Sequence, residues 1–322
     1  MRILVTGSTG FIGAALCRAL VEQGHDVRAF HRSSSNLRLL DGLPVEHSIG
    51  DLTQPETIEA ALQDIEVVFH AAAWMGSNEP GKLYAVTVEG TRTVAQAALK
   101  AGVERLVHTS SVAALGAPSP NQPELLNECH TWNLRPEDWS YGYAKYLAEL
   151  EIQKAVAKGL DAVIVNPTVV FGKGDIYRKS SSTVRQVAAR KIGVVVEGGL
   201  NAVHLSDVVE GHLSALARGI AGERYILGGE NLTILSFIQL IARVTSVPAP
   251  SVTLPGGLVR TFRRPVMLLE HFLDLPVSAD LLIMAGRYFY YDIRKAQDEL
   301  LMPAPRPVEQ AVADAFAWFQ AG

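Results

Sequence analysis

The sequence has few cysteines, no excess of positive charge and no long apolar run. Its two cysteines, Cys17 and Cys129, lie far apart without metal-ligand spacing, so neither a disulfide framework nor a metal site is predicted. Lysine and arginine number 29 against 33 aspartates and glutamates, a net charge of −4. Nucleic acid and anionic membrane surfaces bind excess positive charge. We therefore predict no nucleic-acid and no membrane partner.

Apolar segments are too short or too interrupted to predict a signal peptide or a membrane span. The first apolar run ends at Thr6, and residues 266–284 are broken by acidic residues, a histidine and a proline. Hydrophobic residues still make up 48% of the 322 residues, enough for a large buried core. We expect a folded, cytoplasmic protein with one large domain or two.

Over the first two-thirds of the chain, short β-branched segments alternate with segments of helical periodicity, as in βαβ units. The predicted strands are 2–6, 26–30, 45–49, 67–71, 105–110, 161–166 and 224–227, and the predicted helices are 13–23, 57–62, 84–100, 141–158 and 205–218. The sequence thus predicts an α/β fold with a Rossmann-type doubly wound parallel sheet in residues 1–170 and 202–228. A smaller, interleaved α/β substrate-binding domain would comprise residues 171–201 and 229–322.

A glycine-rich segment follows the first predicted strand and begins the first predicted helix. Glycines at Gly7, Gly10 and Gly13 allow a tight turn and a close approach of the backbone to a pyrophosphate. The free amide groups and the dipole at the helix N-terminus would stabilise its charge. The strand before and the helix after disfavour the alternative, a turn that binds nothing. The predicted cofactor-binding residues here are Gly7, Thr9, Gly10, Phe11, Ile12 and Gly13.

The end of the second predicted strand bears on the choice between NAD and NADP. It lacks the carboxylate that binds a ribose 2′-hydroxyl, whereas Arg32 and Ser33 can bind a 2′-phosphate and a protonated His31 adds a donor. NADP(H) is therefore predicted over NAD(H), the alternative being that Arg32 is a solvated loop charge. After the third strand, Asp51 and Leu52 are expected to hold the adenine edge, unless Asp51 only caps a helix.

Tyr141 and Lys145 stand four residues apart in a predicted helix and so share one face. An ammonium beside a phenol lowers the phenol pKa from its usual value of about 10, which makes it a usable acid or base. The pair alone is a weak signal. Together with the glycine-rich segment and with Ser110 and Ser111 just past a strand, it predicts a site for proton transfer.

These motifs together resemble the extended short-chain dehydrogenase/reductase family, also described as the NAD-dependent epimerase/dehydratase family. The matching residues are Gly7, Gly10, Gly13, Asp51-Leu52, His70 to Ala73, Thr109 to Ser111, Tyr141, Lys145 and Asn166-Pro167. The resemblance implies a catalytic triad in which Tyr141 is the acid/base, Lys145 binds the nicotinamide ribose and Ser111 forms a hydrogen bond with the reacting oxygen. Ser110 is the alternative to Ser111. It also implies cofactor contacts from Ala71, Ala72, Ala73, Pro167, Val169 and Val170.

Within the family, residues 27–32 and 166–172 are similar to the dihydroflavonol 4-reductase-like and 3β-hydroxysteroid dehydrogenase-like branch. The arginine that clamps a diphosphate in nucleotide-sugar members is absent before His204. The resemblance therefore implies NADP(H)-dependent hydride transfer to an aldehyde or ketone of a hydrophobic or aromatic small molecule. The alternatives are a nucleotide-sugar epimerase with retained cofactor and a non-catalytic NADP-sensing regulator. A homodimer is left open.

Several further residues keep two interpretations. Trp74 and Met75 would line the substrate pocket or simply pack, and the arginines within 260–264 would bind an acidic substrate group or form a solvated helix face. His70 is interpreted as a buried core histidine rather than an acid. Thr87 stands where many family members have asparagine, which leaves open what it contacts.

Overall fold

A seven-stranded parallel sheet forms the centre of the molecule in the computed structural model, which describes residues 1–74, 79–176, 182–262, 266, 282 and 284–321. Its strands are β1 (Arg2–Thr6), β2 (Asp26–His31), β3 (Glu46–Ile49), β4 (Val67–His70), β5 (Arg105–Thr109), β7 (Ala162–Pro167) and β11 (Arg224–Leu227). They lie in the order β11-β7-β5-β4-β1-β2-β3. The strand order reverses between β1 and β4, as in a doubly wound Rossmann fold, which confirms the predicted fold class.

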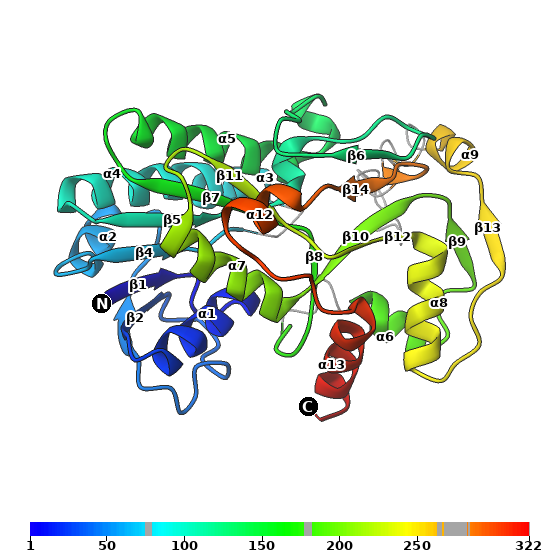
Figure 1. The fold of residues 1–322 in the computed structure, drawn as a ribbon, viewed down its shortest axis with the longest axis horizontal. Coiled ribbons are helices and arrows are strands. Elements are labelled where there is room, and N and C mark those ends of the chain that lie inside the picture. The colour runs from blue at the N-terminus through cyan, green and yellow to red at the C-terminus, as the bar shows by residue number, and fades with distance from the viewer. Residues whose placement is uncertain (75–78, 177–181, 263–265, 267–281, 283, 322) are drawn as a thin grey trace.

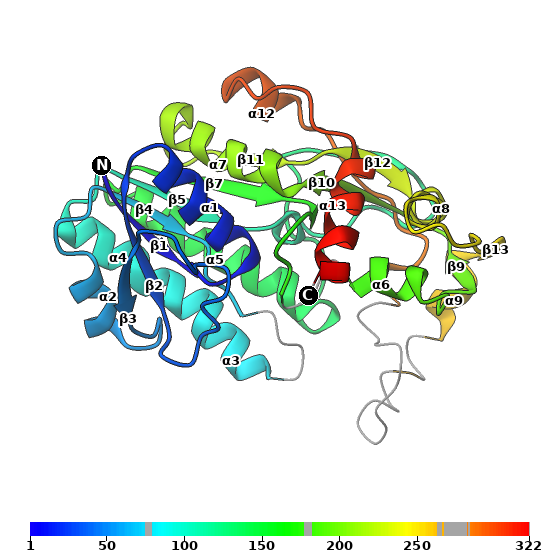
Figure 2. The same cartoon turned by 90° about the horizontal axis from the view of Figure 1, so that it is seen from below.

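Helices cover both faces of this sheet (Figures 1 and 2). One face carries α1 (Phe11–Glu22) and α7 (Leu205–Arg218), and the other carries α2 (Pro55–Ala61), α4 (Gly90–Ala101) and α5 (Ser140–Val156). Successive strand residues point to opposite faces, so Ile3 and Val5 join the core on the α1 side while Leu4 joins the core on the α4 side. Burial on both faces explains the continuous β-branched runs in the sequence.

Smaller sheets and further helices lie beyond the carboxyl ends of the central strands (Figure 1). The strands are β8 (Val169–Phe171), β10 (Gly199–His204) and β12 (Glu230–Thr233) in one sheet, β9 (Val194–Val196) with β13 (Val252–Leu254), and β6 (Glu124–Leu126) with β14 (Phe289–Tyr291). The helices are α6 (Ser182–Ala188), α8 (Ile234–Val244), α9 (Gly256–Thr261) and α13 (Val308–Ala321), and α12 (Arg294–Glu299) packs on β11. A separate apolar core around Phe171, Phe237 and Val312 holds several of these elements together.

The predicted helix 84–100 is the one that differs most from the structure. It is divided into α3 (Pro80–Tyr84), a π-helical turn η1 (Ala85–Glu89) and α4, whereas the other predicted elements agree to within two residues at either end. Apolar periodicity does not separate a π turn from an α turn, because both bury nearly the same residues. Single π turns inside helices often occur at functional sites. Among the described residues, no helix is long and apolar enough to cross a membrane.

Candidate active site

The glycine-rich segment forms a tight turn between β1 and α1 in which larger residues do not fit. Gly7 has a φ of +67°, and a Cβ added to it would lie 2.7 Å from the backbone nitrogen of Ala72. A Cβ on Gly13 would lie 2.1 Å from the carbonyl oxygen of Gly7. Gly10 caps α1 without a side-chain hydrogen bond, so no side chain occupies the amides of the first helical turn. These residues fit a dinucleotide, whose pyrophosphate would bind at those amides.

Other predicted cofactor residues surround this turn. Ser8 donates a hydrogen bond to the carbonyl oxygen of Phe30 at 3.0 Å, which ties the turn to the end of β2. Thr9 is buried in the turn, and Phe11 and Ile12 begin α1. The remaining predicted residues follow the neighbouring strands: Ala71, Ala72 and Ala73 follow β4, Pro167 ends β7, and Val169 and Val170 begin β8. The turn and the ends of β2 and β4 therefore meet at the carboxyl ends of adjacent strands in the sheet.

Arg32 and Ser33 are exposed just past the end of β2. The carboxylate of Asp51 accepts hydrogen bonds from the backbone nitrogen of Thr53 at 2.9 Å and from its hydroxyl at 2.8 Å. These bonds, with a smaller contribution from the charge of Arg32, lower the pKa of Asp51. Asp51 therefore braces the loop before α2 and does not cap that helix, whose N-cap is Gln54, while Leu52 is buried against Gly90.

His31 is not the free donor that the sequence predicts. The ring is buried, with Nδ1 lying 3.0 Å from the carbonyl oxygen of Arg32 and Nε2 lying 3.0 Å from Nδ1 of His47. His47 was not identified from the sequence, because its contact with His31 arises only from the pairing of β2 with β3. Arg32 is left as the exposed cation at this strand end.

The predicted triad comes together where β5 ends against α5. Ser111 caps the short 3₁₀-helix η2 (Val112–Leu115), where its hydroxyl accepts from the backbone nitrogen of Ala113 at 3.2 Å, and it lies close enough to the phenol of Tyr141 to oppose the rise in the pKa of that group. Lys145 lies one turn further along α5 and donates from Nζ to the carbonyl oxygen of Thr109 at 2.9 Å. The hydroxyl of Ser110 donates instead to a carboxylate oxygen of Glu149 at 2.6 Å. Of the two serines, Ser111 is therefore the one beside the phenol.

The protonation of this site differs from the prediction. Burial raises the pKa of Tyr141 to about 12, and the nearby hydroxyl of Ser111 only partly opposes this change. The expected lowering of the Tyr141 pKa by Lys145 is therefore wrong for this structure. Burial also lowers the pKa of Lys145 to about 8, although the charge of Glu149 raises it. At neutral pH the phenol is protonated and neutral, and most of the lysine is an ammonium.

His70 is a core residue, as predicted. Its Nδ1 lies 2.7 Å from the hydroxyl of Thr6 and its Nε2 lies 3.0 Å from the hydroxyl of Thr91. The Thr91 hydroxyl donates to the carbonyl oxygen of Thr87, so it accepts from Nε2–H, and Nδ1 accepts from Thr6. Burial lowers the pKa of His70 to about 3. The ring is therefore neutral and both of its nitrogens are occupied.

Apolar side chains surround the ring of Tyr141. One cluster comprises Trp74, Leu83, Tyr84, Val88, Tyr141, Ala144 and Leu147. The hydroxyl of Thr87, in the π turn, accepts a hydrogen bond from the backbone nitrogen of Trp74 at 3.1 Å, which fixes the segment after β4. Arg260 donates to the carbonyl oxygen of Ala285 at 2.6 Å. Met75, Arg263 and Arg264 lie outside the described residues.

Comparison with known proteins assigns this site to a family. The model of the NAD dependent epimerase/dehydratase family matches residues 3–228. The chain belongs to this family. It is 37% identical over 327 aligned positions to a putative dihydroflavonol 4-reductase of Synechocystis sp., covering 98% of this chain and 94% of that relative. The family and branch predicted from the sequence are thereby confirmed.

Two further relatives are similar to this chain over nearly its whole length. The sterol demethylase protein B of Methylococcus capsulatus is 34% identical over 337 positions, which cover 99% of this chain and 98% of that protein. The crystal structure of gox2253 has a TM-score of 0.88 at 36% identity and covers 99% of this chain and 98% of that chain. The smaller sheets beyond the central one are thus part of the shared architecture.

Proposed function

We propose that the protein is an NADP(H)-dependent oxidoreductase that transfers hydride to the carbonyl of a hydrophobic or aromatic aldehyde or ketone. One observation carries the proposal: Ser111, the half-buried phenol of Tyr141 and Lys145 one helical turn later come together at the carboxyl end of β5, on the side of the sheet that carries the glycine-rich turn. A proton donor and a dinucleotide cradle are the two parts that carbonyl reduction requires.

In this mechanism a bound nicotinamide supplies the hydride, and the residues of the chain manage the proton. Tyr141 holds its proton at neutral pH and donates it to the carbonyl oxygen as negative charge develops there. Ser111 orients that oxygen through its hydroxyl. Lys145 stabilises the phenolate left after the transfer and binds the ribose. Ser110 is not assigned this role, because its hydroxyl is committed to Glu149.

The apolar cluster around Tyr141 supports the substrate class. The side chains of Leu83 and Leu147 carry no group that binds a diphosphate, whereas the cluster would bury an aromatic or aliphatic substituent next to the carbonyl. The test is a screen of hydrophobic aldehydes, ketones and nucleotide sugars for NADPH oxidation. We expect consumption of NADPH with hydrophobic carbonyl compounds. Interconversion of UDP-glucose and UDP-galactose without net NADPH consumption would instead assign the chain as an epimerase.

Arg32 should set the preference for NADP(H). Because an exposed guanidinium follows β2 and no carboxylate is present there, we expect NADPH to bind at least about tenfold more tightly than NADH. Arg32→Ala should remove most of this preference, as measured by fluorescence titration with both cofactors. Lys100→Ala, which removes an exposed cation paired with Glu59, is the control and should leave the ratio unchanged. Equal dissociation constants in the unmodified protein would contradict the assignment of NADP(H).

A further inference from the structure

A carboxylate side chain, that of Glu149, lies on the same face of α5 as Tyr141 and Lys145. Glu149 follows Lys145 by four residues, so the phenol, the ammonium and the carboxylate occupy three successive turns. The Glu149 residue is only 4% exposed. A buried carboxylate is costly unless charges and hydrogen bonds compensate it, so its partners indicate what it does.

The Glu149 carboxylate forms hydrogen bonds with residues at the ends of two neighbouring strands, β5 and β7. One oxygen, Oε1, accepts from the hydroxyl of Ser110 at 2.6 Å and from Nδ2 of Asn166 at 2.6 Å. The same Nδ2 also donates to the carbonyl oxygen of Ser111 at 2.9 Å. The backbone on both sides of the Ser110–Ser111 peptide is thereby tied to α5 through one carboxylate.

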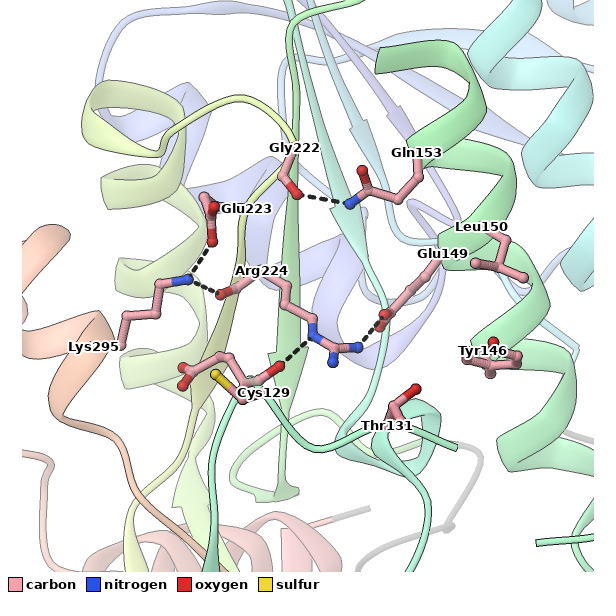
Figure 3. Close-up of a pocket in the computed structure, with 11 residues that line it drawn as sticks. Cys129, Thr131, Tyr146, Glu149, Leu150, Gln153, Gly222, Glu223, Arg224 and Lys295 are labelled. Atoms are coloured by element: carbon pink, nitrogen blue, oxygen red, sulfur yellow. Dashed lines mark hydrogen bonds and ion pairs between the residues drawn. The ribbon is translucent and has the colours of Figure 1, made fainter. Parts of the chain in front are cut away.

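The second oxygen of Glu149 pairs with Arg224 at the start of β11 (Figure 3). Nη1 of Arg224 lies 3.0 Å from Oε2, and the rest of the guanidinium donates to the carbonyl oxygens of Glu128 at 2.9 Å and His130 at 2.7 Å. The pair borders a pocket of about 340 Å³ between α5 and β11. Glu149 is therefore one of the residues that line this pocket.

We propose that Glu149 is a positioning residue for the Ser111–Tyr141–Lys145 site: it fixes the backbone of Ser111 through Ser110 and Asn166, and its carboxylate is the negative charge that stands one helical turn from the ammonium of Lys145. The proposal rests on the proposed function of that site. Among the described residues, the other titratable groups next to Lys145 are Tyr141, one helical turn before it on α5, and His70 on β4 and His108 on β5, whose rings the charge of Lys145 reaches. Each of these is neutral at neutral pH, so Glu149 is the anion among them.

The test measures the ionisation of Lys145 in the free protein, without substrate or turnover. With ¹³Cε-labelled lysine, the Lys145 signal is assigned by its loss in Lys145→Met and then followed against pH by NMR. We expect a midpoint of about 8 in the unmodified protein. In Glu149→Gln the midpoint should fall by about one pH unit or more, because removal of an adjacent opposite charge disfavours the ammonium. An unchanged midpoint in folded Glu149→Gln would overturn the proposal, whether or not the protein reduces carbonyls.

Two variants separate charge from structural damage. Arg224→Met breaks the same ion pair but leaves the carboxylate in place, so the Lys145 midpoint should stay at or above its unmodified value. Glu151→Gln removes another buried carboxylate of α5, one that pairs with Arg92 and Lys154, and should leave the midpoint unchanged. A midpoint that falls equally in all three variants would show a general loosening of α5 and would overturn the charge role.

The pocket beside Glu149 allows a second measurement. In Glu149→Ala, added formate can enter through the pocket and replace the missing carboxylate. We expect formate, but not chloride at the same ionic strength, to move the Lys145 midpoint back toward about 8. An equal response to the two salts would count against the proposal.

Discussion

Replacing Tyr141 with phenylalanine should lower kcat by about 10²- to 10⁴-fold while NADPH affinity changes little. The variant keeps the ring within its apolar cluster and removes only the hydroxyl that lies close to Ser111, so the proton donor is lost and the glycine-rich turn is untouched. Single-turnover reduction and NADPH fluorescence titration measure the two quantities separately. The substrate for the assay is the best hydrophobic carbonyl compound found in the screen.

Tyr143→Phe is the matched control for this variant. Tyr143 lies on the same helix, packs on Trp132 with ring centroids 5.5 Å apart, and should lose little activity without its hydroxyl. Retention of more than about half of the turnover in Tyr141→Phe, where chemistry limits the rate, would remove Tyr141 as the acid. Tyr143 would then be the next donor to test, since the nitrogens of His70 are already occupied.

Acid should unfold this protein at a mildly low pH because three neutral histidines are buried in its centre. The ring centroids of His70 on β4 and His108 on β5 lie 5.2 Å apart. His212 on α7 forms a hydrogen bond with the hydroxyl of Thr109. Burial lowers the pKa of His70 to about 3 and that of His212 to about 4, and it places the His108 pKa well below its usual range. The unfolded chain therefore takes up protons below about pH 6.5 that the folded chain does not bind.

The free energy of unfolding therefore decreases as pH falls from about 6.5, the pKa of a histidine in the unfolded chain, toward the lower pKa values of the three histidines in the folded protein. The three histidines together should cost about 4 kcal/mol by about pH 5.5, a large part of the 5–15 kcal/mol that typically stabilises a domain. Urea unfolding at several pH values measures this loss. His108→Leu should reduce the pH dependence by about a third. It should also stabilise the protein at neutral pH by about 1–3 kcal/mol, because neither ring nitrogen of His108 has a hydrogen-bond partner among the residues that the structure describes.

Replacement of a neighbouring apolar residue is the control for this experiment. Val107→Ala truncates a buried side chain next to His108 in β5 and removes no titratable group, so it should lower stability at every pH and leave the slope of stability against pH close to that of the unmodified protein. If His108→Leu and the unmodified protein lost stability in parallel between neutral pH and about pH 5.5, the buried histidines would not be the cause of acid unfolding.

The central sheet could be predicted from the sequence because its strands are buried on both faces. Such strands consist of continuous runs of β-branched residues, which are easily recognised. The glycine-rich turn and Ser111 could be placed for a related reason: each follows a strand end that the sequence marks clearly. Tyr141 and Lys145 could be placed because they stand one helical turn apart in α5. The π turn at 85–89 could not be predicted, since no periodicity distinguishes it from α-helix.

Contacts between distant segments are the part that the sequence does not reveal. Glu149 has the pattern of an ordinary charged helix residue, and its partners Asn166 and Arg224 come 17 and 75 residues later. The pairing of His31 with His47 likewise depends on strand register. The direction of the Tyr141 pKa shift was predicted wrongly because a neighbouring charge can be inferred from spacing, whereas the extent of burial cannot.

The distance along the chain between Glu149 and Arg224 bears on how the protein is made. Chains emerge from the ribosome N-terminus first, so α5 is complete before β11 has been synthesised. Until Arg224 emerges, burial of the Glu149 carboxylate would leave it without the guanidinium that pairs with it at 3.0 Å, at a cost of several kcal/mol. The face of α5 that carries Tyr141 and Lys145 therefore cannot settle favourably against the sheet before the edge strand β11 arrives. The half of the sheet that carries the glycine-rich turn can form early in synthesis, but the half that carries Tyr141 and Lys145 is completed late.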